Sequence, residues 1–559
     1  MPSQLFPGLF VLLCLVARAY GEEITTLAYI DSIAPPALME GVGNSHLAIS
    51  TDEDDAQLYF DQGVSLLHDF WWFEAYRAFL HASKLDPEAA MPHWGLYLAG
   101  DNMANLSPEQ REEILNTAVE SMKSLRDKAS VREQYYMDAV IALHEKDGDE
   151  GVAAHNKTLL ALLNEYPDEI EARLFLWTQL DAGYDARGKP KEEQLYAQLL
   201  LEREFEDHGD HPGLLHYWIH NQEPGPRPAS ALEAAKKLAR LAPNSGHIVH
   251  MPGHIHYLMG NYALAHNQFT KAEDADARYM ASYGIEPIFT WNYLHNFSFI
   301  MSNLAEAGRY EEGAEYADKL AGLTEKSSFK HLPGFEMLLS RAMMEQAYMA
   351  MRLEQFELAA ALISNPRWDT WEKGDGLLSL QEAYHSYSAG MAAIQKGEIE
   401  EAERFSRKLD SVLWRSERDE AKLGYRKKPI EIAALELQGA VAAANGDVDE
   451  GIELLERAVA LEADIEYGEP RSNIHPAAES LAKLRAEKGD FEGAREAYEL
   501  VLRQRPNAGM PLYGIARSYA LEGDSKNARK AYEAFLAAWP EADDNLIQMS
   551  MARAWLAQN

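Results

Sequence analysis

Histidines four residues apart occur twice, at His216 and His220 and again at His250 and His254. Residues at this spacing in a helix project from the same face, so each pair could bind one metal ion together. The two pairs also stand in register along the chain, because 250 − 216 and 254 − 220 both equal 34. A structural repeat of that length would bring the pairs to equivalent places in neighbouring units.

Further polar residues accompany these pairs, since ten of the 19 histidines lie between His208 and His295. The predicted metal ligands are His216, His220, His250 and His254, and the predicted ligand-binding neighbours are His247, Glu223, His295 and Asn296. A site made of imidazoles suits Zn²⁺, Cu²⁺, Ni²⁺ or Fe²⁺, and neutral rings add no charge repulsion around a cation. If the residues converge, the expected cofactor is therefore a transition metal.

Two other interpretations stay open at this point. The histidines could form a buried polar network without metal, or they could lie on the surface with a spacing that arose by chance. A lone helical histidine such as His81, His155 or His385 is usually only hydrogen-bonded or exposed.

Pro252 lies between His250 and His254. A proline inside a helix breaks the turn around it, unless the helix begins near Pro252 and leaves His250 on a loop.

The elements that must position these residues are helices, because from Ala56 onward apolar residues recur at intervals of three and four. Starting at Ala56, a 34-residue unit places aromatic residues, small residues and a final proline at Tyr59, Gly63, Ala75, Phe79, Ala82 and Pro87. This pattern resembles the tetratricopeptide repeat. Similar units begin at His475 and Gly509, with weaker ones near Ala383 and Ile432.

Each helix hairpin of such a repeat buries its apolar face only against its neighbours. We therefore expect an all-α fold, a right-handed α-solenoid of tetratricopeptide-repeat helix hairpins with a concave groove. Further 34-residue units begin at Pro212, Gly246 and Leu294. Positions 2, 5, 9 and 12 of these units are occupied by the predicted site residues His216, His220, Glu223, His247, His250, His254 and His295. The resemblance implies that these positions line the groove.

Three segments, His216 to Glu223, Gly246 to Ile255 and Tyr293 to Asn296, resemble recurring blocks of a large, poorly characterised family of tetratricopeptide-repeat proteins. The first repeat, from Ala56 to Gly63 with the later Trp94-Gly95, is similar to the opening block of that family. The resemblance covers roughly residues 43 to 300. It implies the fold and the shared histidine blocks, but no reaction. The family often has Ser where Gly253 stands.

Composition and the N-terminus limit the function classes. With 52 Lys+Arg against 89 Asp+Glu, the net charge of −37 repels phosphate backbones, so a nucleic-acid binder is not expected.

The apolar run Leu9 to Ala17 has the length of a signal-peptide core and is too short to cross a bilayer. We predict an exported protein, secreted or periplasmic, without a membrane span. Cleavage would remove Cys14, the only cysteine.

The predicted organisation is a signal peptide (1–21), an extended arm (22–55), an N-terminal repeat solenoid with the histidine pocket (56–370) and a C-terminal repeat solenoid (371–559). The predicted function is a scaffold that binds a peptide or protein partner in its groove, with a transition-metal site in the pocket. The alternative is a metalloenzyme for hydrolytic or oxidative chemistry, in which Glu223 or His295 moves protons. Three protein ligands beside a deep pocket would favour catalysis, and a closed sphere of four would favour a structural site.

Overall fold

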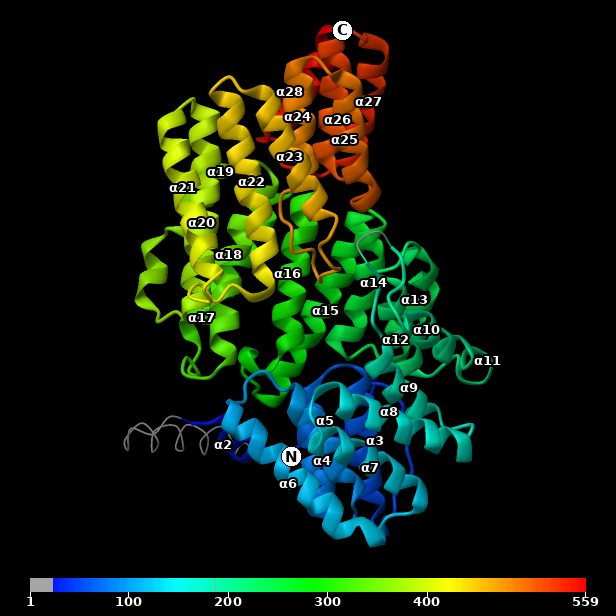
Figure 1. The fold of residues 1–559 in the computed structure, drawn as a ribbon. Coiled ribbons are helices and arrows are strands. Elements are labelled where there is room, and N and C mark those ends of the chain that lie inside the picture. The colour runs from blue at the N-terminus through cyan, green and yellow to red at the C-terminus, as the bar shows by residue number, and fades with distance from the viewer. Residues whose placement is uncertain (1–23, 186–187) are drawn as a thin grey trace.

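The computed structural model describes residues 24–185 and 188–559. Within these ranges helix follows helix, and the only β pairing is an isolated bridge between Tyr184 and Pro190 (Figure 1). The predicted all-α class is therefore confirmed. No helix in the described part of the chain is both long enough and apolar enough to cross a membrane. The predicted signal peptide at 1–21, with Cys14, lies outside the described residues.

Consecutive helices pack in pairs as hairpins. The first six pairs are α3 (Asp54–His68) with α4 (Trp72–Leu85), α5 (Met91–Asn102) with α6 (Pro108–Leu125), α7 (Val131–Glu145) with α8 (Gly148–Glu165), α9 (Ile170–Leu180) with α10 (Gln194–Glu202), α12 (Pro212–Gln222) with α13 (Leu232–Leu241), and α14 (Gly246–Leu258) with α15 (Tyr262–Tyr283).

The remaining pairs are α16 (Trp291–Glu306) with α17 (Tyr310–Lys326), α18 (Gly334–Arg352) with α19 (Phe356–Ile363), α20 (Asp375–Lys396) with α21 (Ile399–Ser416), α22 (Lys427–Ala444) with α23 (Val448–Glu462), α24 (Ala477–Lys488) with α25 (Phe491–Gln504), and α26 (Gly509–Glu522) with α27 (Ser525–Ala538). The shorter or terminal elements are α2 (Thr26–Ser32), α11 (Phe205–His208), α28 (Ile547–Gln558) and the 3-10 helices η1 (Arg126–Lys128), η2 (Pro228–Ala231), η3 (Pro287–Phe289), η4 (Pro366–Thr370) and η5 (Gly424–Arg426).

The packing inside a hairpin explains the spacing of small and aromatic residues. A Cβ added to Gly63 would lie 2.5 Å from the ring of Phe79, and one added to Gly95 would lie 2.4 Å from the same ring. Gly253 of α14 and Phe269 of α15 hold the same positions in their repeat as Gly63 and Phe79 do in the first, and a Cβ on Gly253 would lie 2.4 Å from the ring of Phe269. The aromatic ring thus fills the space that each glycine leaves, which is the packing predicted from the repeat.

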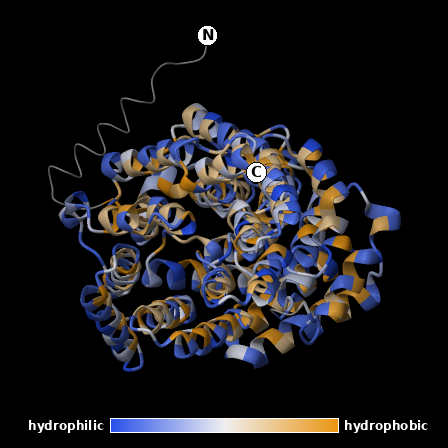
Figure 2. Ribbon diagram, turned by 90° about the horizontal axis from the view of Figure 1, so that it is seen from above, coloured by the Kyte–Doolittle hydropathy of each residue, from blue (hydrophilic) through white to orange (hydrophobic). Residues whose placement is uncertain are grey.

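The hairpins stack into a solenoid, because the first helices of successive hairpins also contact each other from α12 through α14, α16, α18, α20, α22 and α24 to α26. The stack curves enough for distant repeats to meet. Tyr262 donates a hydrogen bond to the carbonyl of Pro506 at 2.9 Å, and Trp539 Nε1 donates to the carbonyl of Glu306 at 2.7 Å. Figure 2 shows the helices from above, most with hydrophobic and hydrophilic residues along their length.

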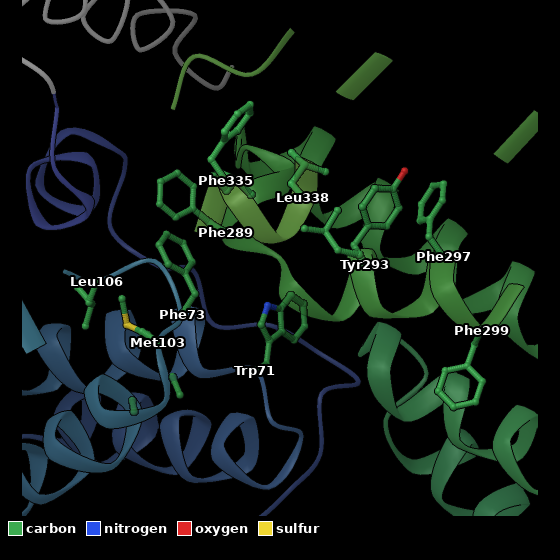
Figure 3. Close-up of a cluster of buried hydrophobic side chains, with 14 of the residues drawn as sticks. Trp71, Phe73, Met103, Leu106, Phe289, Tyr293, Phe297, Phe299, Phe335 and Leu338 are labelled. Atoms are coloured by element: carbon green, nitrogen blue, oxygen red, sulfur yellow. The ribbon is translucent and has the colours of Figure 1, made fainter. Parts of the chain in front are cut away.

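The arm at 22–55 is not extended throughout, because residues 26–32 form α2. Tyr29 of this helix is fully buried and its ring stacks on Phe289, with centroids 4.3 Å apart. Phe73 of α4 packs on the same ring, with centroids 5.1 Å apart. Figure 3 shows this core, in which side chains near the N-terminal end meet those of η3, α16 and α18. The buried aromatic rings therefore join the first hairpins to the middle of the solenoid.

Candidate metal centre

Three neighbouring helices bring the predicted site residues together. They are His216, His220 and Glu223 from α12 and its C-terminal cap, His247, His250 and His254 from α14, and His295 and Asn296 from α16. Helix α14 contacts both α12 and α16. All eight residues are buried except His220, whose side chain keeps 13% of its surface exposed. The equivalent unit positions of the histidines therefore face one common pocket.

Helix α14 is continuous across Pro252. It begins at Gly246, so His247 and His250 are helical, and the alternative start near Pro252 is wrong. Proline removes one backbone donor, and the rest of the helix remains hydrogen-bonded around it. Gly246 allows α15 to approach this helix end, because a Cβ there would lie 2.1 Å from a carboxylate oxygen of Asp276. His250 and His254 therefore project from the same face, as the spacing predicted.

The six histidines form two groups of three. His216, His220 and His247 make the first group, and His250, His254 and His295 make the second. In each group the three nitrogen atoms that could bind a metal lie within 4.8 Å of one another. An ion that binds imidazole nitrogens at about 2.0–2.1 Å could be reached by all three after small side-chain movements.

The Nδ1 atoms of both histidine pairs face oxygen acceptors. In the first group His216 Nδ1 lies 2.5 Å from the carbonyl oxygen of His68, and His220 Nδ1 lies 2.7 Å from Glu223 Oε1. In the second group His254 Nδ1 lies 2.8 Å from Glu223 Oε2. A neutral imidazole has one N–H, so donation from Nδ1 leaves a lone pair on Nε2.

His250 is oriented in the same way by Asn296. The amide Nδ2 of Asn296 donates to the carbonyl of Phe269 at 2.8 Å, so Oδ1 is the atom that lies 2.7 Å from His250 Nδ1. Acceptors that hold the second ring nitrogen in this manner are typical of histidines that bind metals. Asn296 is therefore placed to orient a ligand rather than to serve as one.

The Nε2 atoms point at each other within each pair. The two Nε2 atoms are 3.0 Å apart in His216 and His220, and 2.5 Å apart in His250 and His254. Neutral rings that donate from Nδ1 would present lone pairs to each other here, so each contact needs a cation or an additional proton between the two nitrogen atoms. A metal ion could supply this charge in either pair, and a proton could also do so.

The third histidine of each group has an unpartnered ring nitrogen. Neither Nδ1 nor Nε2 of His247 has a hydrogen-bond partner among the described residues, and Nε2 of His295 has none either. Both rings are buried, with 2% and 6% of their surface exposed. A buried polar atom without a partner costs about 1–3 kcal/mol, which metal coordination would offset.

Burial keeps most of these rings neutral at pH 7. It lowers the pKa of His216, His247, His250 and His295 well below the ordinary value, and that of His254 to about 4. His220 differs, because the carboxylates of Glu223 and Glu469 outweigh the effect of burial and raise its pKa well above that value. Neutral imidazole is the form that binds metals, so the site needs little deprotonation.

A cavity of about 1030 Å³ adjoins the histidine pocket. Glu469 lines it, and its Oε1 lies 3.6 Å from Nδ1 of His220. Tyr257 and Ser298, on α14 and α16, also line the cavity. Glu469 could not be predicted as a site residue from the sequence. It lies in the segment between α23 and α24, far along the chain from the histidines and outside any repeat motif.

A third group of candidate ligands, His220, Glu223 and Glu469, overlaps the first, and a fourth, Glu354, His475 and Glu479, lies elsewhere. Its carboxylates already have cationic partners. Glu354 pairs with Lys483, and Glu479 pairs with Arg352 at 3.1 Å. These residues therefore form an ion-pair network that is complete without a metal.

The fold and the pocket define a helical-repeat protein with a buried histidine centre. No family model matches the chain, and no curated protein matches it. Among solved structures, the crystal structure of the APC/C hetero-tetramer Cut9-Hcn1 is similar at a TM-score of 0.32 and 14% sequence identity, over 91% of this chain and 85% of that chain. The function of the pocket therefore has to follow from its own geometry.

Proposed function

We propose that the protein is an exported metalloenzyme that binds a first-row transition metal in the histidine pocket and acts on a substrate in the adjoining cavity. The observation that carries the proposal is the orientation of the imidazoles. Four Nδ1 atoms face oxygen acceptors, so the Nε2 lone pairs point inward at each other. Such a set of donors gains most from a borderline cation such as Zn²⁺, Cu²⁺, Ni²⁺ or Fe²⁺.

The number of ligands favours catalysis over a structural role. Each group offers three histidine nitrogens, which leaves coordination positions for water or substrate. A bound metal would supply a Lewis acid and a nucleophilic water for a hydrolytic step, or a redox centre for an oxidative one. The cavity gives a substrate room next to Glu469, which links it to His220.

Glu469 is the residue best placed to move a proton. Both oxygens of Glu223 are occupied by His220 and His254, so Glu223 acts as a positioning residue. Glu469 instead lines the cavity with 26% of its side chain exposed. Burial and the nearby charge of Glu223 raise its pKa above the ordinary value, which makes its carboxylate a stronger base than an exposed one.

The cavity favours an anionic ligand. Its lining holds seven Lys and Arg against five Glu, in a chain whose net charge is −37. Among the described residues, Arg341 and Arg471 have no carboxylate oxygen within 4.0 Å, and they donate hydrogen bonds to Ser298 and to main-chain carbonyls. A peptide or protein partner, as predicted for the groove, could present its terminal carboxylate or an acidic side chain here.

Metal content tests the proposal. We would measure first-row metals by mass spectrometry in the untagged mature protein after dialysis, beside a His216→Ala/His250→Ala variant. The matched control is His81→Ala/His385→Ala, which changes two histidines outside the pocket. We expect metal in the wild type and the control and its loss from the pocket variant, with helix content unchanged by circular dichroism. Absence of metal from the wild type, even after incubation with Zn²⁺ or Cu²⁺, would reject the proposal.

A further inference from the structure

We infer that the pocket is built for two metal ions, each held by its own three histidines. This inference rests on the proposed function, because it concerns the same site. Its substance is the number of ions and the division of the ligands. His216, His220 and His247 would hold one ion, and His250, His254 and His295 would hold the other.

The first argument is that the two groups share one construction. Each contains a pair four residues apart with facing Nε2 atoms, at 3.0 Å in the first group and 2.5 Å in the second. Each also contains one histidine from outside the pair with an unpartnered nitrogen, His247 in the first and His295 in the second. A single ion would satisfy one such group and leave the other with a buried, unpartnered ring.

The second argument comes from the aromatic walls. Phe70 contacts all three rings of the first group, with centroid distances of 4.7 Å to His216, 5.4 Å to His220 and 5.8 Å to His247. Phe299 contacts all three rings of the second group, with centroid distances of 4.9 Å to His250, 4.1 Å to His254 and 5.2 Å to His295. Each group therefore packs against a phenylalanine of its own.

The third argument is the separation between the groups. The shortest centroid distance across them is 5.8 Å, between His247 and His250. Within the groups the centroid distances range from 4.4 Å, between His250 and His254, to 6.1 Å, between His220 and His247. The division therefore rests on the ligand nitrogens, which lie within 4.8 Å of one another in each group. The ligands therefore gather around two centres that lie next to each other.

Two residues connect the centres. Glu223 accepts hydrogen bonds from a ligand of each group, through Oε1 from His220 and through Oε2 from His254. Trp291 packs between His247 and His295, with centroid distances of 5.4 Å and 5.3 Å. Neighbouring ions can bind a substrate oxygen and a nucleophilic water at the same time, which suits the hydrolytic form of the proposed function.

The stoichiometry of Zn²⁺ binding tests the inference. Metal-free full-length mature protein would be titrated with Zn²⁺ at pH 7 in a calorimeter, and the bound metal counted after gel filtration. We expect two equivalents for the wild type and for the His81→Ala/His385→Ala control. One equivalent would overturn the two-ion inference and leave the proposed metal site standing. No binding would overturn both.

Single variants assign the ligands to each centre. His247→Ala removes a ligand from the first group only, and His295→Ala removes one from the second group only, so we expect each variant to bind one equivalent of Zn²⁺. Two equivalents in both variants would overturn the assignment of three histidines to each ion. Should a variant unfold, the wild-type stoichiometry by itself still decides between one ion and two.

Discussion

Glu223 Oε2 accepts a hydrogen bond from His254 Nδ1 at 2.8 Å, although the two residues belong to successive repeats. The other oxygen of the same carboxylate faces His220 Nδ1 at 2.7 Å. One buried carboxylate therefore sets the orientation of a ring in each histidine group. This arrangement makes Glu223 a positioning residue whose effect on metal binding can be measured directly.

Replacing Glu223 by Gln is expected to weaken metal binding about 10- to 100-fold, the usual effect of losing a residue that orients metal ligands. The amide keeps only one acceptor oxygen and turns an N–H toward the second imidazole N–H. Competition of the protein with a chelator for Zn²⁺ measures the change. The control is Glu233→Gln on α13, where the side chain is 85% exposed. Equal affinities for the two variants would contradict the assigned role.

Gly253 is expected to tolerate no side chain. A Cβ there would lie 2.4 Å from the buried ring of Phe269, so Gly253→Ala should lower the free energy of unfolding by about 1–3 kcal/mol. The control is Gly322→Ala on α17, where no atom lies within 4 Å of the added Cβ and the helix should gain about 0.5–1 kcal/mol. Urea unfolding compares the two. A neutral Gly253→Ala would show that α14 and α15 can separate at little cost.

Phe79 is expected to be one of the residues on which the first repeats most depend. Its fully buried ring fills the space left by Gly63 and Gly95, so Phe79→Ala should cost about 3–5 kcal/mol of unfolding free energy. Leu199→Ala, at a side chain 60% exposed, should change it by no more than about 0.5 kcal/mol. Thermal and urea unfolding would report both values. Similar losses for the two variants would mean that the ring does not carry the packing assigned to it.

Acid is expected to weaken the contact between α16 and the C-terminal repeats. Burial alone would raise the pKa of Glu306, but the guanidinium groups of Arg352 and Arg505 hold it at about 2, below the ordinary 4.5. A group with a lowered pKa contributes its stability above the unfolded-state pKa and loses it as the pH falls toward the folded-state value. The contribution, roughly 3 kcal/mol, should therefore be complete above about pH 4.5 and decline from there toward pH 2.

The Glu306→Gln variant isolates this effect. The difference in unfolding free energy between wild type and variant should be largest above pH 4.5 and should shrink as the pH falls toward 2. Urea titrations at several pH values between 3 and 7 measure it, with Glu233→Gln as the control. A difference that stays constant over this range would show that the ion pairs do not lower the pKa of Glu306.

The helical repeat and the register of the histidines could be predicted from the order of residues alone. Both are local properties, because the intervals between apolar residues define helices and a 34-residue period defines equivalent positions. Thus Gly63 and Phe79 were assigned to repeat positions, and His250 and His254 were matched to His216 and His220. Those predictions needed no knowledge of which repeats meet in space.

The contacts that join these residues into one site depend on how the repeats pack in three dimensions. The acceptors of the imidazole N–H groups are the carbonyl of His68, Asn296 and Glu223, and Glu469 approaches from beyond α23. None of these contacts follows from a local period, because each depends on how far the stack of hairpins curves. The division of the six histidines into two groups, one packed on Phe70 and the other on Phe299, could not be predicted either. Ring contacts between repeats depend on packing and not on spacing along the chain.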